Sequence, residues 1–403
     1  MNINSPNVEL IFDTFREFGY KIYAVGGCVR DIVLGKEPKD IDFCTDATPD
    51  EMKEIYFKHF CRGNVIKLIP TGEKFGTLTF RFSEQNEQYE ITTFRTDGRY
   101  EDGRHPKEVS YTKTLEEDLS RRDFTINAIA YNPEEGLVDP FNGLQDIENR
   151  VVRCVGDPKE RFNEDALRIL RLVRFAIRYN FDIEHTTYLR AIELVNNLNY
   201  VSRERVGKEL QEIFNYRLVN LDIHSRSAEL LRIILRQIFP LVDTDVKSMV
   251  VLAEHVPLLR WYDCCVQENE QEMMTFINRF AVGSDIANGV KNLRRAFDSY
   301  KHYGYHYQKR VLGIIRTSEE RKAFLSRLIM EQEDIEPLVR AIVNNEPYSI
   351  EQLAVDGNWI MKELNLSPGP EVKEMLEKIL DYICVNPYFN TENDIRKFIV
   401  RTN

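Results

Sequence analysis

Two acids near the N-terminus have a spacing that suits a metal ion. Asp40 and Asp42 stand at positions i and i+2 of the β-like run DIDF, so both carboxylates are expected on one face of a strand. Two adjacent anions repel each other, and a divalent cation would offset that repulsion. Hard oxygen ligands that leave room for water and phosphate suit Mg²⁺. The pair therefore predicts a Mg²⁺ site that faces a phosphate-bearing substrate.

Two glycines and an arginine precede this acidic pair in the stretch KIYAVGGCVRD. Gly26 and Gly27 let the backbone approach a ligand closely, and a helix that begins near Val29 would point its N–H groups at an anion. Arg30 could hold a phosphate from the side. A lone DxD or GG pair is common in solvated turns. The ordered combination instead predicts phosphoryl or nucleotidyl transfer, in which Mg²⁺ activates a hydroxyl and stabilises the leaving pyrophosphate.

A second segment, NEDALRILRLVRFAIRYNF, carries an acid and three arginines at intervals of three residues. These are Asp165, Arg168, Arg171 and Arg174. A helix over 163–181 would place all four on one face, which is either a solvated basic surface or a binding site. A carboxylate only accepts hydrogen bonds and a guanidinium only donates them, so Asp165 beside Arg168 matches a base edge with an amino group next to a ring nitrogen. Cytosine and adenine present that edge, whereas guanine and uracil present the reverse order.

With these residues in place, GGCVRD followed by DIDF resembles the signature of the class II tRNA nucleotidyltransferase and bacterial poly(A) polymerase family, a branch of the polymerase-β-like nucleotidyltransferases. The resemblance implies that Asp40 and Asp42 are the catalytic residues that bind the metals. It also implies that Gly27 and Arg30 contact the phosphates of the incoming nucleotide. A third carboxylate is expected on a neighbouring strand, and Glu90 in YEITTFR is the candidate.

Two more segments resemble motifs of this family. In SRRDFTINAIA (120–130) the arginine pair could simply end a helix, where cations are favoured. The resemblance implies that Arg122 approaches the triphosphate, while Asp123 and Asn127 place the sugar. RERVGKEL (203–210) resembles the motif that follows, in which Glu204 and Arg205 would brace the template helix.

The segment 163–181 resembles the family motif EDxxRxxRxxRF. That resemblance makes Asp165 and Arg168 an amino-acid template for the base and gives Arg171 and Arg174 a supporting role at the nucleotide. Poly(A) polymerases of the family lack this regular arginine run. The charged, glycine-containing loop within 95–120 is long here, whereas members of the family that add only CC have a shortened one.

The elements that must position these residues divide the chain into two regions. The first 140 residues predict helices over 7–19, 48–57 and 114–123 and strands within 21–27, 40–47, 76–82 and 89–95. Thr48 is expected to cap the second helix, and Thr114 with Glu117 has capping-box spacing in the third. Beyond about residue 155 the pattern is helical throughout. The expected fold is an α+β polymerase-β-like head with a mixed sheet, followed by an all-α neck, body and tail.

The expected domain boundaries follow from this pattern. They are 1–150 for the catalytic head, 151–215 for the neck with the nucleotide-selecting helix, 216–300 for the body and 301–403 for a tRNA-binding tail. The segment 291–310 interleaves Lys and Arg with Tyr and His, which suits either an RNA backbone or a helical hairpin with an aromatic core.

Composition narrows the class of protein. The 403 residues carry a net charge of −11, so any nucleic-acid partner has to be met by a local basic surface. No run is long and apolar enough for a membrane span, and no secretion signal is evident, so the cytoplasm is the expected location. The seven cysteines show no CxxC pair and are expected to be reduced and mostly buried.

The working hypothesis is addition of CCA to the 3′ end of tRNA without a nucleic-acid template, using CTP, ATP and Mg²⁺. The expected RNA contact is the acceptor and T-arm minihelix, and no obligate protein partner is evident. The enzymatic alternatives are a partial enzyme that adds only CC or only A, and a bacterial poly(A) polymerase. An alternative of another class is a tRNA-binding protein that refolds its ligand without catalysis.

Overall fold

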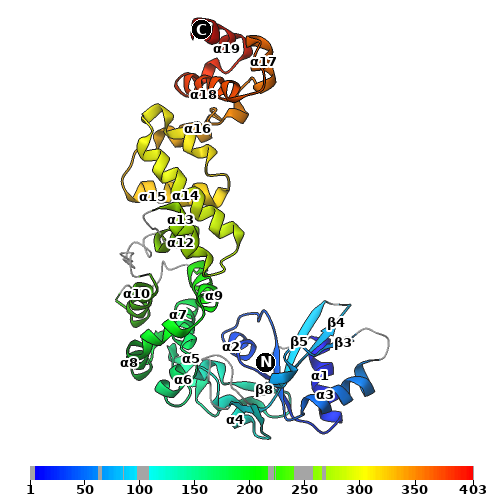
Figure 1. Cartoon of the computed structure of the whole chain (residues 1–403). Helices are drawn as coiled ribbons and strands as arrows, with labels where there is room; N and C mark the ends of the chain where they lie inside the picture. The colour runs from blue at the N-terminus through cyan, green and yellow to red at the C-terminus, as the bar shows by residue number, and fades with distance from the viewer. Residues whose placement is uncertain are drawn as a thin grey trace. The chain divides into compact units, whose positions relative to one another are not determined.

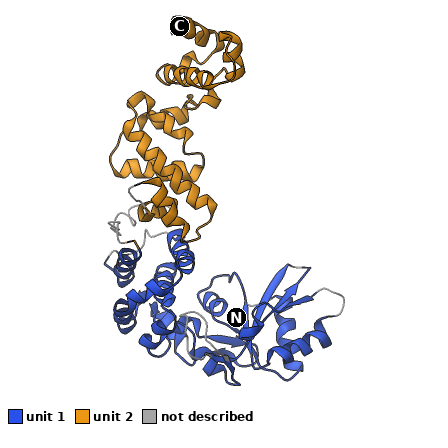
Figure 2. Ribbon diagram, viewed as in Figure 1, with its two compact units in different colours: residues 1–238 blue, residues 239–403 orange. Residues whose placement is uncertain are grey.

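The computed structural model describes residues 5–61, 66–84, 86–97, 109–216, 222, 224–239, 257–265 and 269–402. The chain divides into two compact units, residues 1–238 and 239–403 (Figure 2). Strands and helices combine in the first unit, while the described residues of the second unit form helices only (Figure 1). The expected fold class, a mixed-sheet head followed by a helical remainder, is confirmed.

A seven-stranded sheet forms the centre of the head, with strand order β3-β4-β5-β2-β1-β8-β9. The strands are β1 (Ile22–Val25), β2 (Asp42–Thr45), β3 (Ile66–Ile69), β4 (Thr77–Phe82), β5 (Glu87–Thr93), β8 (Ala130–Asn132) and β9 (Gly136–Val138). Only β2 and β5 pair in parallel; the other neighbours in this sheet are antiparallel. The sheet is therefore mixed, as expected. A separate two-stranded ribbon joins β6 (Arg95–Asp97) to β7 (Val109–Tyr111).

Helices and short helical turns connect these strands. They are α1 (Pro6–Glu17), α2 (Gly27–Val33), α3 (Pro49–Ile55), η1 (Tyr56–Phe60), η3 (Glu73–Phe75), α4 (Leu115–Ser120), η4 (Thr125–Asn127) and α5 (Gly143–Glu148). The predicted Thr48 cap of α3 is confirmed, because its hydroxyl accepts from the Glu51 N–H and the Glu51 carboxylate bonds back to the Thr48 N–H. The predicted Thr114–Glu117 capping box of α4 is wrong. Glu117 accepts a hydrogen bond from the hydroxyl of Thr112 instead.

The rest of the first unit is helical apart from one pair of two-residue strands, β10 (Val151–Val152) and β11 (Asp182–Ile183), which run parallel. The helical elements are α6 (Pro158–Glu164), α7 (Leu167–Tyr179), α8 (His185–Leu194), η5 (Val195–Tyr200), α9 (Arg203–Asn215) and α10 (Arg226–Ile238). Helix α7 packs against both α9 and α10 and buries ten of its thirteen residues. This central placement makes α7 a rigid support for side chains that project from it.

The second unit contains α12 (Pro257–Cys265), α13 (Glu270–Asn278), α14 (Ser284–His302), η6 (Tyr305–Gly313), α15 (Ser318–Met330), α16 (Glu336–Val343), η7 (Ile350–Gln352), α17 (Gly357–Leu364), α18 (Pro370–Val385), η8 (Pro387–Phe389) and α19 (Glu392–Thr402). A separate hydrophobic cluster holds the last helices together; its centre includes Ile360, Ile379 and Ile395. No helix among the described residues is both long and apolar enough to span a membrane. All seven cysteines are free, and all but Cys61 are buried.

Candidate nucleotidyl-transfer site

The acidic edge of the sheet lies where β2 and β5 run side by side. Asp42 opens β2 and is paired in register with Glu90 on β5, so the two carboxylates come from adjacent strands. Asp40 lies two residues before β2 and not on it, because the strand begins only at Asp42. The expectation that both aspartates lie on one strand is therefore wrong for Asp40. Asp40 belongs to the loop that leads into the acidic edge.

Two neighbouring acids act on the carboxyl of Asp42. Burial of Asp42 raises the pKa of its carboxyl to about 6, and the charges of Glu90 and then Asp40 add to the rise against an opposing effect of Arg122. Neighbouring protein atoms keep part of the water away from the Asp42 carboxyl without covering it, because Asp40, Asp42 and Glu90 are all exposed residues. A repelling set of oxygen ligands that is open on one side fits a hard divalent cation. Within the described ranges, no three His, Cys, Asp or Glu side chains are already grouped closely enough to hold one ion.

A glycine turn lies at the start of α2. Gly26 has φ +78°, a conformation that favours glycine, and its backbone N–H donates to the carbonyl of Ile129. A Cβ built at Gly26 would lie 3.0 Å from Nη1 of Arg122, and one at Gly27 would lie 3.5 Å from Nη2 of Arg30. The turn is therefore flanked by two guanidinium groups, which is an arrangement suited to phosphate oxygens.

Arg30 is deeply buried, with only 3% of the residue exposed. Its Nε and Nη2 donate to Oδ1 of Asp31 at 2.9 and 2.8 Å, and its Nη1 donates to Oδ1 of Asn127. The structure thus places Arg30 at the glycine turn as expected, but in the protein interior. Its predicted contact with a nucleotide phosphate is not tested by these interactions and stays a prediction.

Arg122 is held at the glycine turn by a buried acid. Asp118 on α4 pairs with Nη2 of Arg122 at 3.3 Å and with Nη2 of Arg121 at 2.8 Å, and its own side chain is fully buried. Although burial alone would raise the pKa of the Asp118 carboxyl, the charges of Arg121 and Arg122 bring it below its ordinary value. Asp118 therefore stays ionised and fixes both arginines.

The proposed template residues lie at a break between two helices. Asp165 has extended backbone angles after α6, and α7 begins only at Leu167. The prediction of one helix over 163–181 is therefore wrong at its start, because Asp157 caps a separate helix that begins with Pro158. The Asp165 carboxylate accepts from the Leu167 N–H at 3.0 Å and pairs with Nη2 of Arg205 at 2.6 Å.

Arg168 follows on the first turn of α7 and is almost entirely buried. Its Nη1 contacts Oε2 of Glu164 at 2.5 Å and donates to the carbonyl of Arg161 at 3.1 Å. Its Nη2 donates to the carbonyl of Arg121 at 3.2 Å, which links α7 to the segment that carries Arg122. Both template residues therefore lie in the same short region, each with partners that fix its direction.

The two remaining arginines of the motif are also held by acids. Arg171 donates from Nε and Nη2 to Oδ2 of Asp123 at 2.9 and 2.6 Å, while Nε of Arg174 lies 2.8 Å from Oε2 of Glu209 on α9. Burial favours the neutral form of Asp123, yet Arg171 and Asn127 outweigh it and lower the pKa of this carboxyl to about 2. Burial raises the pKa of Glu209 despite the two arginines beside it.

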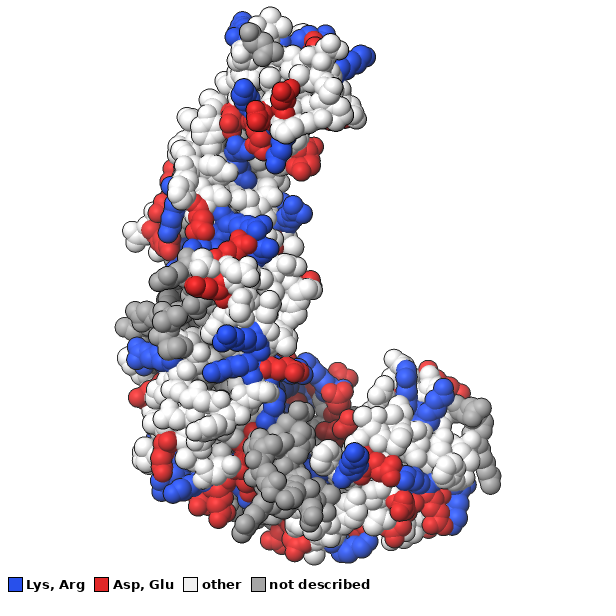
Figure 3. All heavy atoms as spheres, viewed as in Figure 1, with Lys and Arg blue, Asp and Glu red and all other residues white. Residues whose placement is uncertain are grey.

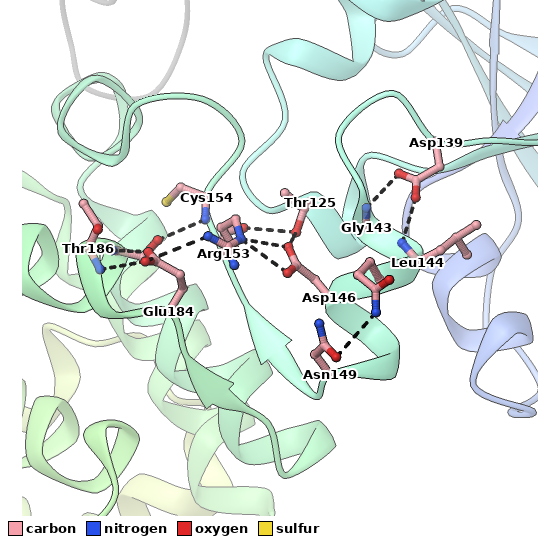
Figure 4. A network of polar contacts seen from close by, with 12 residues as sticks. Thr125, Asp139, Gly143, Leu144, Asp146, Asn149, Arg153, Cys154, Glu184 and Thr186 are labelled. Atoms are coloured by element: carbon pink, nitrogen blue, oxygen red, sulfur yellow. Dashed lines mark hydrogen bonds and ion pairs between the residues drawn. The ribbon is translucent and has the colours of Figure 1, made fainter.

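A further polar network supports the segment that carries Asp123 and Asn127 (Figure 4). Thr125 donates from its hydroxyl to Oδ2 of Asp146 at 2.7 Å, and Nε of Arg153 contacts the same carboxylate at 3.1 Å. Arg153 also lies 3.9 Å from Glu184, which caps α8. A Cβ at Gly143 would lie only 2.2 Å from the carbonyl oxygen of Thr125, so this position has no space for a side chain. These contacts hold η4, the turn that contains Thr125 and Asn127, in place.

Sequence reasoning missed two acids of this site. Asp118 precedes Arg121 and Arg122 by three and four residues, the spacing at which side chains meet on a helix, and this signal could have identified it. Glu209 follows Arg205 by four residues on α9, so both face α7. Its partners are remote in sequence, and spacing alone could not have named them.

Comparisons with known proteins bear on this arrangement of acids and arginines. A family model described as the poly A polymerase head domain matches residues 22–153. A CCA-adding enzyme of Lactobacillus helveticus is 30% identical over 414 residues, which cover 96% of this chain and 95% of that protein. The chain belongs to the CCA-adding enzyme family. A CCA-adding enzyme of Streptococcus suis is 31% identical over 409 residues and covers 96% of this chain and 94% of its own length.

Solved CCA-adding enzymes share the fold along nearly the whole chain. The Bacillus stearothermophilus CCA-adding enzyme in complex with CTP aligns with a TM-score of 0.72 and 26% identity, covering 99% of this chain and 98% of that one. The Thermotoga maritima CCA-adding enzyme complexed with tRNA aligns with a TM-score of 0.73 at 22% identity, covering 100% and 97%, which shows the fold alone. The family expected from GGCVRD and DIDF is confirmed.

Proposed function

We propose that this CCA-adding enzyme builds the 3′ end of tRNA by nucleotidyl transfer from CTP and ATP, with release of pyrophosphate. The family assignment makes the chain a nucleotidyltransferase. The observation that carries the proposal to this chain's own residues is the position of the Arg121–Arg122 segment. Nη1 of Arg122 lies at Gly26, its charge acts on the carboxyl of Asp42, and the Arg121 carbonyl accepts from Arg168 at the start of α7. The relatives and the solved structure described above are named CCA-adding enzymes, which favours this function over a partial enzyme, a poly(A) polymerase or a non-catalytic tRNA-binding protein.

Asp40 and Asp42 would hold Mg²⁺ at the acidic edge, with Glu90 as the third carboxylate. The donor set fits this ion, because the oxygens of the acids are hard ligands and because burial, with the negative charges of Glu90 and Asp40, raises the pKa of the Asp42 carboxyl, a cost that a bound cation would offset. When bound, Mg²⁺ supplies activation of the attacking hydroxyl and stabilisation of the leaving pyrophosphate. The carboxylates orient the ion, and they are ionised when it binds.

The phosphates of the incoming nucleotide are assigned to the glycine turn. Gly27 would allow the closest approach of the backbone, and Arg122 would meet the triphosphate from the other side of the turn, where its Nη1 already lies against Gly26. Arg30 completes this cluster. The role of these residues is electrostatic: they hold negative oxygens in place while the bond to the leaving group breaks.

The base is assigned to Asp165 and Arg168, with Arg171 and Arg174 supporting the nucleotide beside them. Asp165 accepts from the amino group of cytosine or adenine, and Arg168 donates to the ring nitrogen next to it. Uracil and guanine would place a carbonyl against the carboxylate and an N–H against the guanidinium, which leaves buried charges without partners. The fixed partners of both residues keep this pattern rigid.

The RNA backbone is assigned to the second unit. Residues of α14 and the segment after η6 line a groove of about 630 Å³, and its cations are Lys291, Arg295 and Arg316. Arg295 makes a bidentate pair with Glu270 at 2.7 and 2.8 Å, whereas the side chain of Arg316 is exposed. Positive and negative side chains alternate over this unit (Figure 3). We propose that the groove meets phosphates of the acceptor and T-arm minihelix.

Other expectations stay predictions. The subdivision into head (1–150), neck (151–215), body (216–300) and tail (301–403) is proposed as a functional division of the chain, and the cytoplasm is the proposed location. No obligate protein partner is proposed. The long loop that distinguishes full addition from CC addition includes residues 98–108, which lie outside the described residues.

Incubation of the purified chain with tRNA that lacks its 3′ end, and with each nucleoside triphosphate singly and in combination, tests this function. CTP alone should give two added residues, and CTP with ATP should give three. An open-ended tail, or an end after one or two residues with both nucleotides present, would contradict the proposal. Incorporation of UMP as readily as CMP would contradict the template formed by Asp165 and Arg168.

A further inference from the structure

Two aromatic rings of α7 lie against the guanidinium of Arg30. The Cζ atom of Arg30 is 5.0 Å from the ring centre of Phe175 and 4.7 Å from that of Tyr179. The two rings are nearly parallel, at 15°, with centres 6.3 Å apart. Helix α7 therefore presents a pair of ring faces to a cation that belongs to α2, the helix at the glycine turn.

Phe175 also contacts two arginines of its own helix, α7. The Cζ atoms of Arg174 and Arg171 lie 4.7 and 5.4 Å from its ring centre. One ring thus touches an arginine assigned to the phosphates and two assigned to support of the nucleotide. The face of an aromatic ring attracts a cation, and this attraction grows when the cation is shielded from water.

The geometry leaves Arg30 able to bind a ligand. A guanidinium has five N–H donors, and three of those of Arg30 are used by Asp31 and Asn127 among the described residues. The remaining two belong to Nη1 and Nη2, and Nη2 is the atom nearest to the turn at Gly27. Both ring faces lie against the group within cation–π distance, and these two donors are left for a ligand.

Tyr179 fixes the same unit by a second contact. Its hydroxyl donates to Oδ1 of Asp31 at 2.7 Å, the oxygen that also accepts from Arg30. Arg178 lies 3.3 Å from the other oxygen of Asp31. Burying a cation is costly unless its surroundings offset the lost hydration. For Arg30, the faces of the two rings and the carboxylate of Asp31 provide that compensation.

We propose that Phe175 and Tyr179 are positioning residues for nucleotidyl transfer, because their ring faces hold Arg30 in the orientation that meets the phosphates of the incoming nucleotide. The inference rests on the proposed function and on the phosphate role of Arg30. It also gives α7 two tasks: its first turn selects the base, and its last turns orient the phosphate site.

The proposal predicts a specific pattern of losses. CTP and ATP share the triphosphate, so a variant that frees Arg30 weakens both nucleotides equally and leaves the preference for them over UTP and GTP unchanged. Inorganic pyrophosphate, which has no base, should lose affinity to the same extent. A variant that merely loosens the core would lower stability without this pattern.

Tyr179→Leu removes the ring, and Tyr179→Phe keeps the ring but removes the hydroxyl. Tyr188→Leu is the matched control. Tyr188 and Tyr179 are both 8% exposed, and Tyr188 also donates to a carboxylate, Oε2 of Glu229 at 2.5 Å. Calorimetric binding of CTP, ATP and pyrophosphate to each full-length variant, with a thermal melt of each, separates binding from stability.

We expect Tyr179→Leu to raise Kd for all three ligands by about tenfold, as loss of a shielded cation–π contact predicts. Tyr179→Phe should remain within about threefold of the natural chain, because it retains the ring face. Tyr188→Leu should lower only the melting temperature. Unchanged Kd values in a folded Tyr179→Leu protein, or equal losses in Tyr179→Phe and Tyr179→Leu, would overturn the proposal.

A double-mutant cycle decides whether Tyr179 acts through Arg30. In Arg30→Met the cation is gone, so adding Tyr179→Leu should weaken pyrophosphate binding no further. Additive losses would show that the ring acts on something else and would overturn the inference. Failure of the proposed function looks different: the natural chain would then incorporate neither CMP nor AMP into tRNA, whatever the variants do.

Discussion

The carboxylate of Asp165 is held by the guanidinium of Arg205, with 2.6 Å between Oδ2 and Nη2. The other oxygen, Oδ1, accepts from the Leu167 N–H at 3.0 Å. An acid that reads a base edge has to present its lone pairs in a fixed direction, and these two contacts supply that direction. In the proposed template, helix α9 would take part in base selection without any need to touch the nucleotide.

Arg205→Met tests this relationship, because methionine fills similar space without a charge. Asp165 would keep a single contact, and its carboxylate would rotate. We expect the ratio of UMP to CMP incorporation to rise by about tenfold, the loss of one hydrogen bond to a charged group. Single-nucleotide incorporation assays measure this ratio. The control is Lys208→Ala, whose side chain is 70% exposed and pairs with Glu204; an unchanged ratio in the Arg205→Met variant would contradict the bracing role.

Asp42→Asn should separate activity from stability. Loss of one ligand of the proposed ion should reduce incorporation by at least about a thousandfold. Removal of a carboxylate whose pKa is raised to about 6 relieves repulsion, so the melting temperature without metal should rise. Added Mg²⁺ should then raise the melting temperature of the natural chain but not of the variant.

Thermal melts with and without Mg²⁺ measure the second effect independently of activity. Asp50→Asn is a suitable control, since this side chain on α3 is 92% exposed. A Mg²⁺-dependent rise that persists in Asp42→Asn would remove Asp42 from the metal site.

Asp118→Asn should weaken the positioning of Arg121 and Arg122. The side chain of Asp118 is fully buried and pairs with Arg121 and Arg122, so loss of its charge removes one buried ion pair from each of these cations. We expect a loss of about 3 kcal/mol in the free energy of unfolding, together with a higher KM for CTP and ATP. Denaturant titration and steady-state kinetics check the two effects. A normal KM would show that Asp118 has only a structural role.

Stability at low pH should depend on Asp123. Its pKa in the fold is about 2, below the value of an unfolded chain, so its ionised form stabilises the fold. That contribution, about 2 kcal/mol, is fully present above about pH 4 and is lost as the pH falls toward 2. Denaturant titrations at pH 7, 4 and 3 measure it as the difference between the natural chain and Asp123→Asn. A difference that stays constant with pH would contradict the assignment.

The groove of the second unit should govern the salt dependence of RNA binding. Lys291→Ala and Arg316→Ala should each weaken tRNA binding and reduce the slope of log K against log salt by about one, as expected when one phosphate contact is lost. Binding titrations at several salt concentrations provide the slope. Lys58→Ala, a 58% exposed cation of the head, is the control. Unaltered slopes in both groove variants would place the RNA elsewhere.

The sequence identified most of the head because its signals are local. The strands over 22–25, 42–45, 77–82 and 87–93 lie within or overlap the predicted runs, and Thr48 caps its helix as its spacing predicts. Local signals gave wrong predictions where two nearby residues could make the same contact or where two patterns overlapped. Thr112 captures Glu117 in place of Thr114. The Asp157–Pro158 pair was a helix-start signal that the regular arginine spacing obscured.

Contacts between remote segments could not be predicted in this way. The sequence suggests that Arg30 is a phosphate ligand with no other role. In the structure its guanidinium contacts the rings of Phe175 and Tyr179 and donates to the side-chain amide of Asn127. Glu90 was a candidate only through a family resemblance, and its position opposite Asp42 depends on the pairing of β2 with β5. The hydrophobic period and the capping residues determine where helices and strands form, whereas tertiary packing determines which charged side chains come into contact.

The parallel pairing of β2 with β5 has a consequence for biosynthesis. Asp42 leaves the ribosome well before Glu90, and β3 and β4 lie between them in the chain. A nascent chain that ends within β4 has its glycine turn and aspartates and can pair β1 with β2, but the other edge of β2 has no partner. Closure of a long loop must therefore precede assembly of the acidic edge. Translation products that end before residue 87 therefore lack Glu90 and should be unable to complete the proposed metal site.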